Sequence, residues 1–220
     1  MPISSNNTSN ESPNSEISIA DQFPVNQQCF YLNHAAVAPW PRCTSDAVQK
    51  FAEENCQTGA QGYLTWLKKE QQLRTKLAKL VGSQHQECVA LVKNTSEALS
   101  FVAYGLDWQA GDIIVISDDE FPSNRIVWES LAQKFGVIIQ QVHINTENPE
   151  VEILEAINSS TLKPKLISVS AVQYASGIKL DLAKLGKACK EHNVLFCVDA
   201  IQAVGAMEFK CDEWHIDFAM

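Results

Sequence analysis

The chain has 220 residues, a hydrophobic fraction of 45% and a formal net charge of −9 at pH 7. This length allows one large domain or two small ones, and the apolar fraction is typical of a globular protein with a buried core. The negative charge and the lack of any basic run argue against nucleic-acid binding, and no apolar segment is long enough to span a bilayer. We therefore expect neither a nucleic-acid partner nor a membrane partner.

The first 28 residues are rich in Ser and Asn, and no Lys or Arg precedes Arg42. Such a composition cannot form a core and predicts a disordered tail over residues 1–28. The tail has neither the basic and apolar regions of a secretion signal nor the arginines of a transit peptide. We therefore expect a cytoplasmic protein.

The seven cysteines are an odd number without a C-x-x-C pair, which argues against a disulfide framework and a zinc ribbon. Cys88, Cys189 and Cys197 lie in apolar contexts and are predicted to be small core residues in a reducing compartment. Cys211 and His215 have a spacing that metal ligands can adopt. Two ligands without two more are better explained by chance, so we expect no metal site.

Residues 29–87 are predicted to form an N-terminal segment followed by helices. Two prolines around Trp40 exclude a regular helix or a central strand over residues 31–41. The clearest helical pattern spans residues 65–82, where an apolar stripe ends beside a stop signal at Gly82.

From Cys88 onward, apolar runs rich in Val and Ile alternate with helical patterns. The predicted strands span residues 89–93, 112–117, 137–144, 165–170 and 194–198. The predicted helices span residues 96–106, 123–136, 149–158 and 180–193. The alternation predicts a three-layer α/β/α domain with a mostly parallel central sheet over residues 88–220. Residues 216–220 look like the opening of a further strand that is cut off, so we expect this domain to be incomplete.

Sheets of this class bind ligands at the carboxyl ends of their strands, and three such ends carry candidate groups. No G-x-G-x-x-G turn or Walker A loop follows a strand, which argues against the common dinucleotide and ATP sites. After the first predicted strand, Asn94, Thr95 and Ser96 open a helix. Taken alone, these residues are best explained as a helix cap, but the positive helix end and two hydroxyls would also suit a phosphate.

The second strand end carries Phe121, which stands directly before a proline. An aromatic residue here can be a hydrophobic staple for the next helix, and taken alone this explanation is favoured. The alternative is an aromatic face that stacks on a flat ligand.

The third strand end lies in VLFCVDAIQAVG, residues 194–205, where five apolar residues lead into Asp199 and Gln202 follows. Asp199 could cap the following turn. A buried carboxylate is nevertheless costly unless a cation pairs with it. A flat heterocycle with a protonated ring nitrogen and a ring oxygen would use both side chains, and pyridoxal phosphate is such a ring.

In combination and in this order, these motifs resemble the fold-type I pyridoxal-phosphate enzymes of the class V aminotransferase and cysteine desulfurase group. The resemblance runs from about Tyr31 to Met220 and rests on YLNHAAVAP, KNTSEAL, GDIIVISDDEFPSN, SVSAVQYASG with LDLAKLGKACKEHN, and VDAIQAVG with HIDFAM. It implies the large domain of the pyridoxal-phosphate-dependent transferase fold, and a homodimer when the protein is intact.

The resemblance also implies roles for individual residues. Thr95 and Ser96 match the pair that binds the cofactor phosphate, and Phe121 stands where the family stacks a ring on the pyridine. Asp199 matches the partner of the pyridine nitrogen, and Gln202 matches the residue that contacts the phenolic oxygen.

The resemblance further places Asn33 and His34 in a loop that borders the substrate pocket. It also puts Gln173 and Tyr174 in a loop that approaches the cofactor. The match to the family is weaker for this loop than for the other residues.

The sequence departs from the family pattern at three points. Desulfurases carry a histidine where Phe121 stands, and Phe121 cannot transfer a proton. They often carry Asn where Ala171 stands. The Schiff-base lysine of the family is expected beyond Met220, since Lys210 precedes the last strand and does not match it. No catalytic residue is therefore expected within the chain.

The resemblance implies an enzyme that uses pyridoxal 5′-phosphate and acts on an amino acid by transamination, epimerase-like or C–S/Se lyase chemistry. The 220-residue chain alone is expected to be inactive. One alternative is a cysteine desulfurase or selenocysteine lyase, against which Phe121 argues. The other is a truncated, non-catalytic chain that binds a partner or a phosphate ligand.

Overall fold

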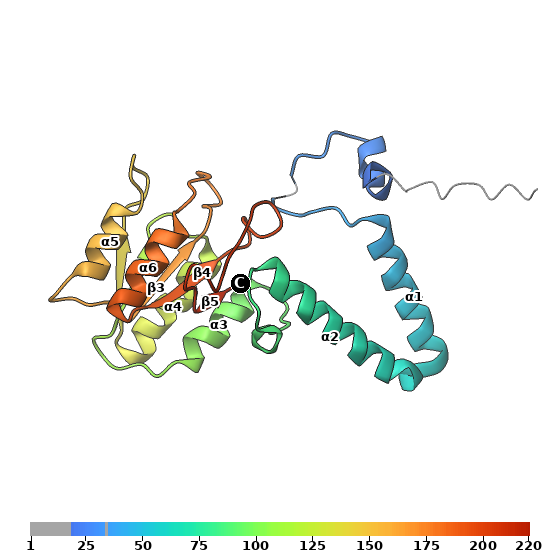
Figure 1. Ribbon diagram of the computed structural model, residues 1–220, viewed down its shortest axis with the longest axis horizontal. Coiled ribbons are helices and arrows are strands. Elements are labelled where there is room, and N and C mark those ends of the chain that lie inside the picture. Colours follow the sequence, from blue (N-terminus) through green and yellow to red (C-terminus); the bar gives the residue numbers. More distant parts are fainter. Residues whose placement is uncertain (1–18, 34) are drawn as a thin grey trace, which may run out of the picture. The chain divides into compact units, whose positions relative to one another are not determined.

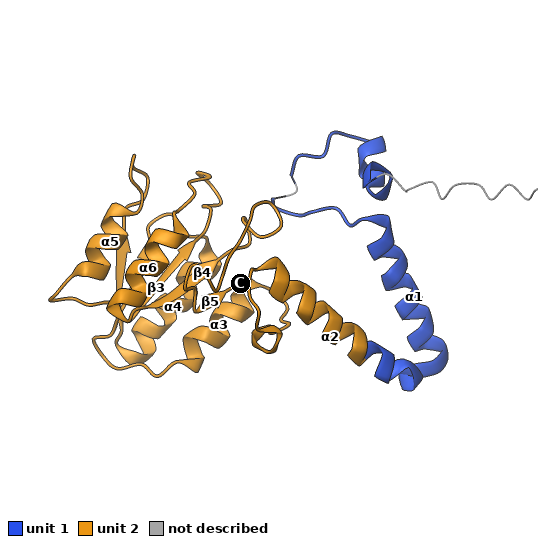
Figure 2. Cartoon of the chain, in the orientation of Figure 1, with its two compact units in different colours: residues 1–66 blue, residues 67–220 orange. Residues whose placement is uncertain are grey.

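The computed structural model describes residues 19–33 and 35–220. The chain forms two compact units, Met1–Trp66 and Leu67–Met220, and the division falls inside a helix (Figure 2). Residues 1–18 of the predicted disordered tail lie outside the described residues. Residues 19–28 contain two single-turn 3-10 helices, η1 (Ile19–Gln22) and η2 (Pro24–Gln27). The predicted domain division between residues 87 and 88 stays a prediction.

The first unit is built on the long helix α1 (Arg42–Thr58), which follows Pro41 as predicted from the proline-rich segment. A 3-10 turn, η3 (Gly59–Gly62), leads into helix α2 (Tyr63–Leu80). The Phe51 and Trp66 rings meet edge to face with centroids 5.2 Å apart, and Trp66 Nε1 donates a hydrogen bond of 3.0 Å to Glu54 Oε1. These contacts join α1 to the first turn of α2.

The second unit contains a five-stranded sheet with all strands parallel, in the order β2-β1-β3-β4-β5. Figure 1 labels β3, β4 and β5 of this sheet together with the helices around it. The strands are β1 (Ile113–Ser117), β2 (Ile138–Val142), β3 (Leu166–Ser170), β4 (Leu195–Asp199) and β5 (Phe218–Ala219). Each of these five strands was predicted, including the short last one.

The predicted strand at residues 89–93 is wrong. After the 3-10 turn η4 (Gln86–Cys88) the chain runs irregularly, and the carbonyl of Val89 accepts a hydrogen bond from the guanidinium of Arg74. Leu91 and Val92 are 42% and 37% exposed. An apolar run becomes a strand only where another strand completes its hydrogen bonds, and none of the five described strands pairs with residues 89–93.

Helices cover both faces of the sheet: α3 (Thr95–Gly105), α4 (Pro122–Phe135), α5 (Val151–Asn158) and α6 (Leu182–His192). Alternate residues of the strands point to opposite faces. Ile114 of β1 packs with Trp128 of α4 in one core cluster, whereas Val115 packs with Ile153 of α5 in the other. α3 and α4 therefore cover one face and α5 and α6 the other, which confirms the three-layer prediction.

Buried cysteines belong to both clusters. Cys197 of β4 and Cys189 of α6 are core residues as predicted, whereas the prediction for Cys88 is wrong because this residue is exposed beside the irregular segment. Among the described residues, no helix is both long and apolar enough to cross a membrane.

The parallel register brings the carboxyl ends of the strands to one edge. Ser117 is the register partner of Val142, and Ser170 is the register partner of Asp199. The loops that follow these strands therefore start from the same edge of the sheet, where ligand sites of such sheets lie.

Candidate functional site

Asp199 is the last residue of β4 and is only 3% exposed. Burial raises the pKa of its carboxyl group to about 6, the N–H of Ile201 opposes this shift, and the nearby Glu120 carboxylate adds to it. None of the ion pairs among the described residues includes Asp199. The ionised carboxylate is therefore a buried charge that a cationic ligand would stabilise.

The turn after β4 explains part of this geometry. Asp199 Oδ1 accepts a hydrogen bond of 3.1 Å from the backbone N–H of Ile201, so the alternative of a local turn cap holds for this oxygen. Gln202 is partly buried in the same turn, three residues after the carboxylate. One backbone hydrogen bond does not neutralise a buried carboxylate, so the cap leaves its need for a cation in place.

The start of α3 is capped as the simpler interpretation predicts. Asn94 Oδ1 accepts a hydrogen bond of 2.9 Å from the N–H of Glu97, and Glu97 Oε2 accepts one of 2.7 Å from the N–H of Lys93. Neither the Thr95 nor the Ser96 hydroxyl takes part in this cap, in the part of the chain that the structure describes. The positive helix end and these two hydroxyls remain able to bind an anion.

Phe121 is the N-cap residue of α4 and is 46% exposed. Its ring meets the Tyr174 ring nearly at a right angle (83°), with the centroids 5.1 Å apart. Tyr174 follows β3, so this aromatic pair joins the loops after β1 and β3. A half-exposed ring in this position can stack on a flat ligand.

Glu120 is a residue of the candidate site that the sequence analysis missed. It is 5% exposed, and its carboxylate accepts five hydrogen bonds from four residues. Oε1 accepts from Ser117 Oγ (2.7 Å), the N–H of Ser170 (2.9 Å) and Gln173 Nε2 (2.8 Å), and Oε2 accepts from Asn124 Nδ2 (2.9 Å) and Ser170 Oγ (2.6 Å). The Glu120 network, defined as these five residues, joins the ends of β1 and β3 to the start of α4.

A signal for this network was present in the sequence. Ser117, Glu120 and Asn124 are spaced by three and four residues across the turn between a buried strand and a helix. The sequence analysis gave Glu120 no role, because charged residues are rarely buried unless they are paired and the sequence does not show the partners.

Gln173 carries an unpaired polar atom inside this network. The residue is 1% exposed, and its Nε2 donates to both Ser117 Oγ (3.1 Å) and Glu120 Oε1. Its Oε1 has no hydrogen-bond partner among the described residues. A buried acceptor without a donor is costly, so a ligand group or water that donates to this oxygen would stabilise the candidate site.

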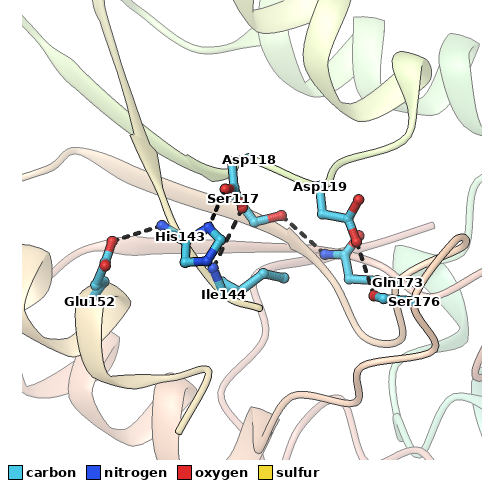
Figure 3. Close-up of polar contacts among 8 residues, drawn as sticks. All are labelled: Ser117, Asp118, Asp119, His143, Ile144, Glu152, Gln173 and Ser176. Atoms are coloured by element: carbon cyan, nitrogen blue, oxygen red, sulfur yellow. Dashed lines mark hydrogen bonds and ion pairs between the residues drawn. The ribbon is translucent and has the colours of Figure 1, made fainter. Parts of the chain in front are cut away.

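A second polar group lies at the ends of β1 and β2, where a cavity of about 330 Å³ opens between Asp118, Asp119, His143 and Ser176 (Figure 3). His143 Nδ1 lies 2.5 Å from Asp118 Oδ2, and this hydrogen bond raises the pKa of His143. Ser176 Oγ donates to Asp119 Oδ2 at 2.9 Å. No cluster of three or more potential metal ligands occurs among residues 19–33 and 35–220.

Asn33 belongs to the first unit. It is exposed, and its carbonyl accepts hydrogen bonds of 3.2 Å from the N–H groups of both Ala36 and Val37. His34 lies outside the described residues. The prediction that these two residues border a substrate pocket stays a prediction.

The candidate site therefore consists of a helix end that is able to bind an anion, a half-exposed aromatic ring and a buried carboxylate without a cationic partner among the described residues. A profile of the Aminotransferase class-V family matches residues 30–220. The chain belongs to the aminotransferase class-V family. The motifs that carried the resemblance lie inside the matched region, as do all the residues of the site.

The chain spans about half the length of the curated relatives that it matches. A probable cysteine desulfurase of Pyrococcus abyssi is 29% identical over 206 residues, which cover 91% of this chain and 51% of that protein. A probable cysteine desulfurase of Methanothermobacter thermautotrophicus is 32% identical over 203 residues, which cover 89% of this chain and 49% of that protein.

Solved structures share the fold of this class-V chain. The cysteine desulfurase CsdA of Escherichia coli matches with a TM-score of 0.78 and 23% identity, over 90% of this chain and 51% of that one. A variant of C-DES with glycine covalently linked to its pyridoxal-phosphate cofactor matches with a TM-score of 0.80 and 22% identity, over 90% of this chain and 54% of that one. These likenesses show the pyridoxal-phosphate-dependent transferase fold.

Proposed function

We propose that the chain forms the cofactor-binding part of a pyridoxal-phosphate enzyme that acts on an amino acid. The observation that carries the proposal is Asp199, a carboxylate that is 3% exposed at the end of a parallel strand and has no cationic partner in the described chain. When bound, pyridoxal phosphate supplies a protonated pyridine ring that withdraws electrons from the α-carbon of an amino acid.

Each site residue has a task in this proposal. Asp199 holds the proton on the ring nitrogen, and Gln202 donates a hydrogen bond to the phenolic oxygen of the ring. Thr95 and Ser96 bind the phosphate with their hydroxyls and with the N–H groups at the start of α3. Phe121 holds the plane of the ring by stacking.

The class of reaction within this proposal depends on Phe121. A phenyl ring holds a flat ligand but moves no proton, which favours transamination, epimerase-like or lyase chemistry in which another group carries the proton. The resemblance predicts a lysine that carries the proton, and none of the five residues given a task above is that lysine.

A cysteine desulfurase is the second candidate function, because the curated relatives quoted above carry that name. Phe121 argues against it, since the family's desulfurases were expected to place a histidine there. A third candidate is a chain that binds a phosphate ligand or a partner without chemistry, for which the start of α3 with the Thr95 and Ser96 hydroxyls would suffice.

We further propose the setting in which the protein works. Residues 88–220 form the incomplete large domain and residues 29–87 the preceding helical segment. The intact protein is a homodimer in the cytoplasm, with an amino acid as substrate and with neither nucleic acid nor membrane as partner. The net charge of −9 supports the exclusion of nucleic acid.

A titration with pyridoxamine 5′-phosphate tests the proposed function, because this ligand carries the ring and the phosphate and needs no lysine for attachment. We expect saturable binding that Asp199→Ala weakens strongly and that inorganic phosphate competes for. A chain that is folded by circular dichroism but shows no saturable binding would contradict the proposal. Competition by phosphate with no contribution from Asp199 would instead support the non-catalytic phosphate-binding chain.

A further inference from the structure

We propose that Glu120 is a positioning residue that sets the spacing between the Phe121 ring and the Asp199 carboxylate. This inference rests on the proposed function, because it concerns the two residues that would hold the ring of the cofactor. It assigns no contact with the ligand to Glu120 itself.

The Glu120 carboxylate is anchored to three elements. Ser117 ends β1, Ser170 ends β3 and Asn124 lies in the first turn of α4, and all three donate to it. Asn124 is anchored in turn, because its Oδ1 accepts from Ser168 Oγ of β3 (2.5 Å) and from Trp128 Nε1 (3.0 Å). Hydrogen bonds to an ionised group are the strong ones, so this junction is held rigidly.

Glu120 is connected to both proposed ring contacts. Phe121 is the next residue along the chain, so fixing the carboxylate at the β1–α4 turn limits where the aromatic ring can lie. Ser170, which donates twice to Glu120, is the register partner of Asp199 across β3 and β4. The carboxylate therefore joins the turn that carries Phe121 to the end of β3, which pairs with the end of β4 that carries Asp199.

The fully satisfied state of Glu120 contrasts with that of Asp199. Five donors hold Glu120 in place, so it needs no cation from a ligand. Asp199, by contrast, forms none of the ion pairs among the described residues. The two buried carboxylates thus have separate tasks: one organises the protein, and the other meets the ligand. Their mutual repulsion also raises the pKa of Asp199, which increases the demand for a cation beside it.

Glu120→Gln tests the inference. It keeps the shape of the side chain but replaces one carboxylate oxygen with an amide N–H₂, which faces groups that are themselves hydrogen-bond donors. Asp119→Asn is the matched control, since it removes an adjacent carboxylate whose hydrogen bond to Ser176 lies outside the Glu120 network. Each variant is titrated with pyridoxamine 5′-phosphate and, separately, with inorganic phosphate, at a temperature where circular dichroism shows it folded. Should Glu120→Gln not fold, Ser170→Ala removes a single side-chain donor and carries the same test.

We expect Glu120→Gln to weaken pyridoxamine 5′-phosphate binding at least about tenfold and inorganic phosphate binding less than about twofold, because only the ring contacts are displaced. In a Phe121→Leu background the same change should cost much less, because two residues that act through one contact are not additive. Equal weakening of both ligands, or full additivity with Phe121→Leu, would overturn the positioning role. A wild-type chain that binds no pyridoxamine 5′-phosphate would overturn the proposed function and this inference with it.

Discussion

Ser170 and Asp199 are register partners at the carboxyl ends of β3 and β4, and the N–H of Ser170 donates a hydrogen bond of 2.9 Å to the buried carboxylate of Glu120. Two acidic side chains from separate parts of the sequence are thereby held at one edge of the sheet. One of them is fully hydrogen-bonded and the other has no cationic partner in the described chain.

Asp199→Asn should change how stability depends on pH. The folded-state pKa is raised to about 6, from an ordinary value of 3.8, so the folded state holds the proton more tightly than the unfolded state. The wild type should therefore lose stability as the pH rises from about 4 to about 6, by up to about 3 kcal/mol, and the variant should not. Urea unfolding at a series of pH values measures the difference, and parallel curves for the two proteins would contradict the assignment.

Asn94→Ala should lower the free energy of unfolding by about 1 kcal/mol, because it removes the side-chain acceptor for the N–H of Glu97. Ser96→Ala is the control, since this exposed hydroxyl takes no part in the cap and its loss should change stability by less than about 0.5 kcal/mol. Thermal unfolding compares the two.

Inorganic phosphate should be bound more weakly by Ser96→Ala than by the wild type. Unchanged phosphate affinity in that variant would remove the Ser96 hydroxyl from the proposed site.

Asp118→Asn should lower the pKa of His143, because the Asp118 carboxylate accepts a hydrogen bond from the ring and attracts its positive charge. The pKa is raised in the folded protein, so this pair stabilises the fold at pH values below the ordinary pKa of histidine and ceases to do so as the pH rises through the folded value. Nuclear magnetic resonance titration of the imidazole measures the shift. His192 serves as an internal reference, and an unchanged pKa for His143 would show that the pair does not form in solution.

Gly186→Ala should destabilise the second unit by at least about 2 kcal/mol, because overpacking cannot be relieved there. A β-carbon at this position of α6 would lie 1.7 Å from the carbonyl oxygen of Trp214. Gly105→Ala is the matched control, since a β-carbon there meets nothing within 4 Å. This control should be neutral or stabilising, and urea unfolding that ranks the two variants in the opposite order would contradict the packing described for α6.

The fold was predictable because its signals are local. The runs of Val and Ile at residues 112–117 and 194–198 are continuous, since both faces of a central parallel strand are covered, and both runs became strands. Residues 89–93 carry the same pattern and are irregular, because a strand also depends on a partner that the pattern does not identify. Local sequence predicts the tendency to be extended but leaves open which run finds a partner.

The site was predictable where a residue stands at a strand end. Asp199 and Phe121 were placed there by counting from the apolar runs, and the structure puts them there. Glu120 was not recognised as part of the candidate site, because its burial depends on donors that lie 50 and 53 residues further along the sequence. The resemblance placed Gln173 in a loop near the cofactor, but its hydrogen bond to Glu120 was not predicted. A long-range network of this kind leaves no periodic signal, so only the three-dimensional structure reveals it.

The protonation state of the bound ring tests the central claim most directly. Pyridoxamine 5′-phosphate labelled with ¹⁵N in the ring is bound to the wild type and to Asp199→Asn, at a pH above the pKa that its ring nitrogen has in water. We expect the ¹⁵N chemical shift of a protonated nitrogen in the wild type and of a neutral nitrogen in the variant. A neutral nitrogen in the wild type, or the same shift in both proteins, would contradict the role of Asp199.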